Sequence, residues 1–81
     1  MNDETVENAI LSLVERRGAG KSICPTDAAR ALDAENWRAR LNAVRNGAIR
    51  LALAGKVDIL RKGKPVDPTD FKGVYRIARK S

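Results

Sequence analysis

The stretch WRARLNAVRNGAIRLALAG, residues 37–55, decides the fold of this 81-residue chain, because it is the longest run with helical periodicity. At about 100° per residue, its apolar side chains form one stripe and its polar side chains occupy the opposite side. The stripe contains Trp37, Leu41, Val44, Ala48, Leu51 and Ala52, and the opposite side contains Arg38, Asn42, Asn46 and Arg50. One face of the predicted helix therefore builds a core, while the other offers guanidinium and amide groups.

The net charge of +6 is concentrated in the second part of the chain. Residues 1–36 contain four basic and seven acidic side chains, a net charge of −3. Residues 37–81 contain twelve basic and three acidic side chains, a net charge of +9. A positive field confined to one part of a small domain favours a polyanionic partner.

Composition narrows the function classes further. No apolar run is long enough for a membrane span, and the start MNDETVEN lacks the regions of a signal peptide, so we expect a cytoplasmic protein with no membrane partner. The chain has no histidine and one cysteine, Cys24, which argues against an enzyme, a metal site, a cofactor or a small-molecule substrate. Cys24 is expected to be a small buried side chain, with a redox role as the less common alternative.

A first helix is predicted from Asn2 or Asp3, either of which can cap it, to Arg17, with Gly18 as its stop. Its apolar side chains repeat at helical spacing and are Val6, Ala9, Ile10, Leu13 and Val14. The following segment GAGKS resembles the end of a phosphate-binding loop, but it follows a helix where a strand is required. We therefore expect a turn and a short extended piece over residues 21–23, with Ile23 pointing inward.

A second, alanine-rich helix, PTDAARAL, is predicted to begin at Pro25, which suits the first helical position. Ala28, Ala29 and Leu32 supply its buried side. Residues 33–36 then form a turn in which Asn36 can cap the long helix. Two helices joined by a turn of this length are typical of a helix-turn-helix, although other helical hairpins share the pattern.

A β-hairpin is predicted after Gly55, which closes the long helix. In KVDILRK the alternation sends Val57 and Ile59 to one face, and GVYRIARK, residues 73–80, is the returning strand. The connection between them, residues 62–73, is rich in turn-forming residues and basic at both ends. We expect Val66 and Phe71 to attach this connection to the body of the domain.

This order of elements predicts an α+β fold of the winged helix-turn-helix type, as a single domain over residues 1–81. It comprises three helices and a small antiparallel β-hairpin wing, with a short strand between the first two helices. The segments GAGKSICP, AARAL, WRARL, VRNGAIRLALAGKVDI, KGKPVDP and GVYRI together also resemble a family of short bacterial winged-helix proteins with no assigned function. The resemblance spans residues 10–77 and implies the same fold, without implying a particular function.

In winged-helix domains, the second helix of the pair enters the major groove with its N-terminal part nearest the base edges. The predicted base-reading side chains are Arg38, Asn42, Arg45 and Asn46. Arginine can pair with guanine and asparagine with adenine, so their chemistry is suitable. The predicted phosphate contacts at the edges of the wing are Arg61, Lys62, Lys64 and Lys72. The competing interpretation is a solvated helix face with Arg45 paired to a carboxylate, and lysines that serve solubility.

The leading functional hypothesis is a module that binds double-stranded DNA, such as a small transcriptional regulator. The alternative is a winged-helix module for protein–protein interaction without direct nucleic-acid binding, since function does not follow from fold. In that case Ile49 and Leu53, which lie off the apolar stripe, belong to the contact surface. RNA binding is less favoured, because no aromatic sheet face is visible. Because the domain offers a small footprint, tight binding calls for a protein partner or a weak homodimer.

Overall fold

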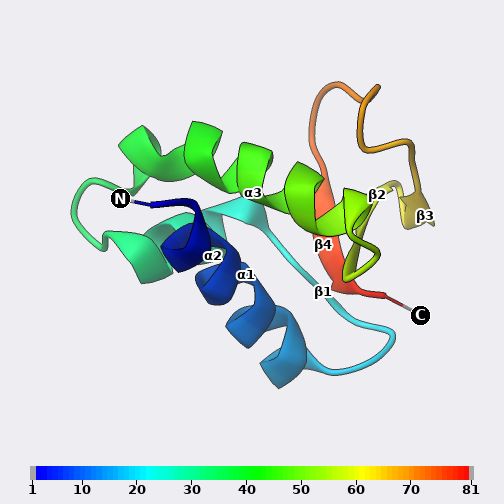
Figure 1. Ribbon diagram of the computed structural model, residues 1–81, viewed down its shortest axis with the longest axis horizontal. Coiled ribbons are helices and arrows are strands. Elements are labelled where there is room, and N and C mark those ends of the chain that lie inside the picture. Colours follow the sequence, from blue (N-terminus) through cyan, green and yellow to red (C-terminus); the bar gives the residue numbers. More distant parts are fainter. Residues whose placement is uncertain (1, 81) are drawn as a thin grey trace.

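The computed structural model describes residues 2–80, in which three α-helices lie to one side of a four-stranded antiparallel sheet (Figure 1). The helices are α1 (Asp3–Arg17), α2 (Pro25–Leu32) and α3 (Leu41–Leu53), with a 3-10 helix, η1 (Trp37–Arg40), before α3. The strands are β1 (Ser22–Ile23), β2 (Val57–Arg61), β3 (Lys64–Pro65) and β4 (Arg76–Arg79), in the sheet order β1-β4-β2-β3. The predicted α+β fold is confirmed, and this arrangement is compatible with a winged helix.

The first helix begins and ends where its capping residues predict. The Asn2 side chain accepts a hydrogen bond from the Thr5 N–H at 2.8 Å, which satisfies one of the free amides of the first turn. At the other end Gly18 adopts a φ of 89°, a conformation that glycine tolerates best, and its N–H donates to the Val14 carbonyl. None of the helices in residues 2–80 is long and apolar enough to span a bilayer.

The crossing of α1 and α3 depends on a glycine. Gly47 is buried in α3, and a Cβ added there would lie 2.9 Å from Val6 Cγ1 and 3.3 Å from Ile10 Cδ1. Those distances are shorter than carbon atoms normally approach, so only a residue without a side chain allows the two helices to come this close. Because Gly47 has no side chain, the side chains of Val6 and Ile10 can pack directly against the backbone of α3.

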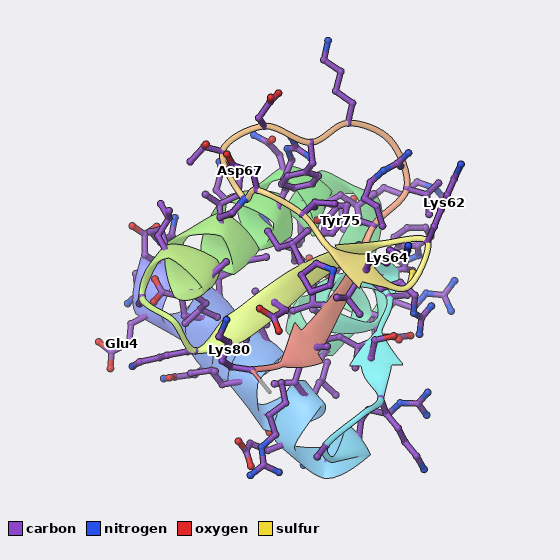
Figure 2. The ribbon with its side chains drawn as sticks, turned by 90° about the vertical axis from the view of Figure 1, so that its right-hand side faces the viewer. Glu4, Lys62, Lys64, Asp67, Tyr75 and Lys80 are labelled. Carbon is purple, nitrogen blue, oxygen red and sulfur yellow. The ribbon has the colours of Figure 1, made fainter. Side chains whose placement is uncertain are left out.

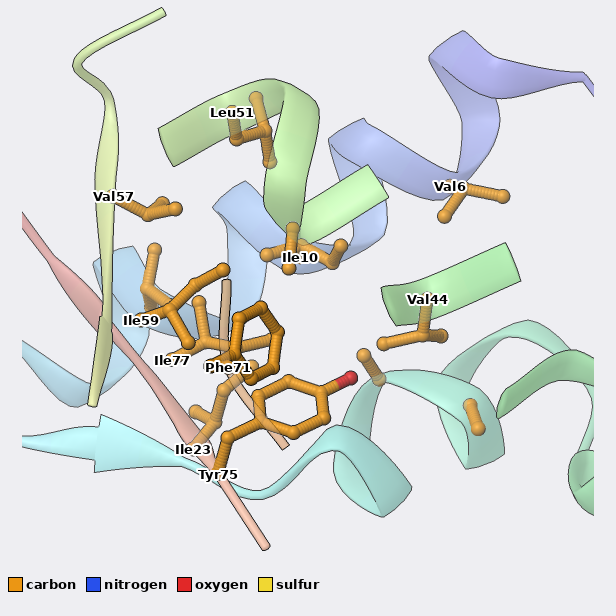
Figure 3. Close-up of a cluster of buried hydrophobic side chains, with 14 residues drawn as sticks. Val6, Ile10, Ile23, Val44, Leu51, Val57, Ile59, Phe71, Tyr75 and Ile77 are labelled. Atoms are coloured by element: carbon orange, nitrogen blue, oxygen red, sulfur yellow. The ribbon is translucent and has the colours of Figure 1, made fainter. Parts of the chain in front are cut away.

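The core joins the inner faces of the helices to the inner face of the sheet (Figure 3). Ile77 of β4 is opposite Ile23 of β1 and Ile59 of β2, and all three are almost completely buried, as the alternation of these segments predicts. Beside them the rings of Phe71 and Tyr75 pack edge to face with centroids 5.2 Å apart. These two aromatic residues of the segment before β4 thus complete the core on this side.

Burial raises the pKa of the Tyr75 phenol. Removal from water disfavours the charged phenolate and raises the pKa of Tyr75 from 10.0 to about 12, while the positive charge of Arg45 acts in the opposite direction and is the weaker effect.

The connection between β2 and β4, residues 62–75, which we call the wing loop, is ordered by its own contacts. Phe71 is buried and Val66 packs against the core, as predicted. The loop also contains β3, which the sequence did not predict, because lysine and proline are weak strand formers. A tight turn with positive φ at Lys62 (53°) and Gly63 (80°) folds β3 back onto β2, and a proline is tolerated at this edge of the sheet.

The long helix predicted over residues 37–55 is interrupted. Its first turn is the 3-10 helix η1, in which the Ala39 N–H donates to the Asn36 carbonyl at 3.2 Å. A 3-10 turn rotates by about 120° per residue, so side-chain positions extrapolated at 100° are wrong for this turn. The expected Asn36 cap is also wrong, because its side chain makes no capping bond; instead the Asp33 side chain accepts from the Asn36 N–H at 3.0 Å.

Arg50 differs from its predicted place on the solvent-facing side of the long helix. Its Nε donates to the Glu7 carboxylate at 2.8 Å, and its Nη2 lies 3.6 Å from Asp3. The side chain is 37% exposed and lies against α1. The acidic first turns of α1 therefore neutralise the basic residue near the end of α3.

Candidate nucleic-acid interface

The outer side of α3 presents amide side chains to solvent. Asn42 and Asn46 are exposed and lie one helical turn apart, so they project from the same side of the helix. Arg38 is also exposed, but it belongs to η1 and lies ahead of the α-helix. Three of the four predicted base-reading residues are therefore accessible at the beginning of α3 and in the turn before it.

Arg45, the fourth of these residues, makes contacts within the domain. Its Nη2 donates to the Phe71 carbonyl at 3.1 Å, and its Cζ lies 4.1 Å from the centroid of the Phe71 ring. Arg45 therefore bonds to a backbone carbonyl and a ring, and not to the carboxylate that the competing interpretation gave it. Arg45 attaches the wing loop to α3 and adds positive charge between them.

Arg61 braces the end of the wing loop. Its Nη1 donates to the Val74 carbonyl at 2.6 Å, and the same nitrogen would lie 2.6 Å from a Cβ at Gly73. Gly73 has a φ of 83° and no side chain, so the guanidinium can cross it at this distance. Arg61 is thus half-buried and orients the chain entering β4, instead of projecting into solvent.

The three lysines predicted at the edges of the wing are exposed: Lys62, Lys64 and Lys72. Figure 2, which looks onto the sheet from the side away from the helices, shows Lys62 and Lys64 projecting from the turn between β2 and β3. None of the three forms an ion pair within residues 2–80. Their charges are therefore available to an external anion.

The wing loop also carries acidic side chains, of which Asp67 is locally engaged. It accepts hydrogen bonds from the Thr69 N–H at 2.9 Å and from the Thr69 hydroxyl at 2.7 Å. The bond from the Thr69 N–H is the main reason that the pKa of Asp67 is lowered from its ordinary value. In Figure 2 Asp67 lies away from Lys62, so its charge does not interrupt the lysine-bearing turn.

Sequence comparison places the chain in a family. The sequence model of DUF3253, described as "Protein of unknown function (DUF3253)", matches residues 3–80. The chain belongs to the DUF3253 family. The match runs from the start of α1 to the end of β4, which confirms the resemblance to an uncharacterised family. No curated protein matches the chain in sequence.

One basic group of this DUF3253 domain was not predicted from the sequence. Arg30 of α2 lies with its Cζ 4.9 Å from the centroid of the Trp37 ring, and Arg38 lies 4.2 Å from the same centroid. The three residues come from α2 and η1 and meet beside the start of α3. No sequence spacing revealed this cluster, because the turn at residues 33–36 sets how α2 and η1 face each other.

The DUF3253 domain also has a groove on its sheet, which lies apart from the predicted site residues. A groove of about 390 Å³ lies on the sheet face away from the helices, lined by apolar Leu60, Pro65 and Ala78 together with Lys21 and Arg79. None of the eight predicted site residues lines it. Residues 2–80 contain no group of three or more histidine, cysteine or carboxylate side chains that could hold a metal ion.

Proposed function

We propose that this DUF3253 domain is a winged-helix module that binds duplex DNA through α3 and the wing loop. The observation that carries the proposal is the contact of Arg45 with Phe71, which holds the lysine-bearing wing loop against α3. A helix alone offers a narrow footprint, whereas a helix and an attached loop can engage the base edges and the backbone together.

The exposed side chains of α3 suit the major groove, which is wide enough to admit an α-helix. Asn42 and Asn46 each carry an amide that can bond an adenine edge in a bidentate manner. Arg38 adds an exposed guanidinium one turn earlier. The two asparagines supply the sequence-dependent part of the proposed contact.

The lysines of the wing loop suit the phosphate backbone. Lys62 and Lys64 flank a tight turn, and Lys72 follows the buried Phe71, so all three project from ordered backbone. Because Arg45 and Arg61 hold the loop from inside, little further ordering is needed when it meets DNA. The net charge of +9 over residues 37–81 favours association with a polyanion of any sequence.

The proposal is tested by fluorescence anisotropy with a short labelled duplex over a range of salt concentrations. Affinity should fall steeply with salt, and Lys64→Ala should lower the slope of log K against log salt by about 0.9, the value for one lost phosphate contact. Arg16→Ala removes an exposed charge on α1 and is the matched control, which should leave the slope unchanged. Absence of binding even at low salt would contradict the proposal.

A second candidate function is a protein-interaction module. It is favoured by Leu53, which is 63% exposed at the end of α3, whereas Ile49 packs against the core of its own chain. Of the two residues proposed from sequence, only Leu53 therefore remains available to a partner. In a pull-down after nuclease treatment, a stoichiometric protein partner should be retained by Lys64→Ala and lost with Leu53→Ser. Recovery that neither substitution alters would count against this function.

A further inference from the structure

We propose that Arg30, Trp37 and Arg38 form a phosphate-binding site at the junction of α2 and η1. The inference rests on the proposed function and deepens it, because the occupant would be a backbone phosphate of the bound duplex. It adds Arg30 to the interface, and it assigns Arg38 to the backbone instead of to a base.

The first argument is the convergence of two positive charges on one ring. The guanidinium carbons of Arg30 and Arg38 lie 4.9 and 4.2 Å from the centroid of Trp37. They are therefore at most about 9 Å apart, which is within the ~10 Å Debye length at 0.1 M salt, so their fields reinforce each other. Attraction to the ring keeps both cations beside Trp37, where an anion that contacts either guanidinium also feels the charge of the other.

The second argument is that nearby carboxylates do not neutralise these arginines. Asp33, in the turn between α2 and η1, pairs with Arg40 at 3.4 Å. Asp27 of α2 accepts from the Cys24 N–H at 3.0 Å and so serves the start of its own helix. Within residues 2–80, neither Arg30 nor Arg38 lies within 4.0 Å of a carboxylate oxygen, that of the neighbouring Glu35 included. The positive charge of the cluster is left for an external ligand.

The third argument is the geometry of guanidinium recognition. A guanidinium stacked on an aromatic ring uses its flat face, which leaves the N–H groups along its edges to donate to oxygen. Two such edges match the oxygens of a phosphate, to which arginine binds in a bidentate manner. Because Arg38 belongs to η1, which leads directly into α3, the site lies at the N-terminal end of α3 and would hold the backbone beside the bases that α3 meets.

Trp37 is the only tryptophan of the chain, so its fluorescence reports directly on this site. The wild-type protein is titrated with a short duplex, and separately with inorganic phosphate at constant ionic strength. We expect the fluorescence of Trp37 to change as the duplex is added, with the same midpoint concentration that anisotropy gives for duplex binding. This expectation holds whether or not inorganic phosphate also changes the fluorescence. A response to inorganic phosphate without one to the duplex, or no response to either, would overturn the inference.

The contribution of Arg30 is measured with Arg30→Gln, a change at an exposed position of α2. Duplex affinity should fall about fivefold to tenfold, and the salt slope should decrease by about 0.9, equally for duplexes of different sequence. Arg30→Lys keeps the charge and should restore the slope, and circular dichroism checks that both variants fold. Arg16→Gln removes the same charge from α1 and should change the affinity less than about twofold, because its distance screens it.

The outcomes separate this inference from the function on which it rests. If the wild type binds the duplex and Lys64→Ala weakens binding, while Arg30→Gln behaves like Arg16→Gln, the phosphate site is wrong and the proposed function stands. If the wild type does not bind the duplex at low salt, both are wrong.

Discussion

Arg38 and Arg50 belong to the same predicted polar face, yet they have opposite surroundings in the structure. Arg50 lies opposite the acidic start of α1 and is bonded to Glu7 and close to Asp3. Arg38 lies against Trp37, without a carboxylate partner in residues 2–80. The comparison teaches that the acids of the neighbouring element, and not the helix face alone, decide whether an arginine is available for binding.

The same contrast divides the segment from η1 to the end of α3 into two parts. The part that begins at Arg38 exposes Asn42 and Asn46, and Arg45 connects it to the wing loop. The part that includes Gly47 and Arg50 packs on α1. We therefore expect substitutions in the second part to change stability and substitutions in the first part to change binding.

The largest expected effect on stability is at the helix crossing. Gly47→Val should lower the free energy of unfolding by about 3 kcal/mol, because its Cβ alone would lie 2.9 Å from Val6 Cγ1. Asn46→Val is the matched control, since it places the same side chain at the neighbouring exposed position, and should cost less than about 1 kcal/mol. Urea unfolding measures both. Equal losses would contradict the assignment of Gly47 to a tight crossing.

A smaller effect is expected from the ion pair that distinguishes Arg50. Arg50→Gln should lower the free energy of unfolding by about 0.5–1 kcal/mol, as is typical of a partly exposed pair. Arg38→Gln should change it by about 0.5 kcal/mol or less, because it loses only an exposed contact with Trp37 and no ion pair. Thermal unfolding of the two variants at low and high salt measures the difference. A greater loss from Arg38→Gln would reverse the comparison.

The pH dependence of stability tests how firmly Tyr75 is buried beside Phe71. Because the pKa of Tyr75 is raised from 10.0 to about 12, the unfolded chain loses the phenolic proton at a lower pH than the folded protein does. The stabilisation that the protonated Tyr75 gives the folded protein is complete below pH 10. It is lost as the pH rises from 10 to about 12. Tyr75→Phe should lack this loss, which urea unfolding on either side of pH 10 measures. Identical pH dependence in the two proteins would show that the phenol is not protected.

Much of the fold follows from local signals in the sequence. Asn2 and Gly18 bound α1, and Pro25 starts α2, because capping and proline geometry act within a few residues. The alternation of Val57 and Ile59 likewise fixes which face of β2 is buried. These features need no knowledge of distant parts of the chain.

The features that the sequence did not reveal depend on contacts between distant elements. The pair of Arg50 with Glu7 joins residues 43 positions apart, and the bond from Arg45 to Phe71 joins residues 26 positions apart. The sequence predicted a place on the polar face of the long helix for Arg50, and a base contact for Arg45 with a carboxylate pair as the competing interpretation. The eight predicted site residues thus include two, Arg45 and Arg61, that the structure uses to hold the wing loop, while Arg30 was missed because only the folded turn brings it to Trp37.

The most direct test of the account is a titration of the wild type, Arg38→Gln and Arg50→Gln with the same short duplex at several salt concentrations. We expect Arg38→Gln to weaken binding about fivefold to tenfold and to lower the salt slope by about 0.9, with Arg50→Gln within about twofold of the wild type. Equal effects of the two substitutions, or a wild-type protein that does not bind, would contradict the claim that the open part of this segment contacts DNA.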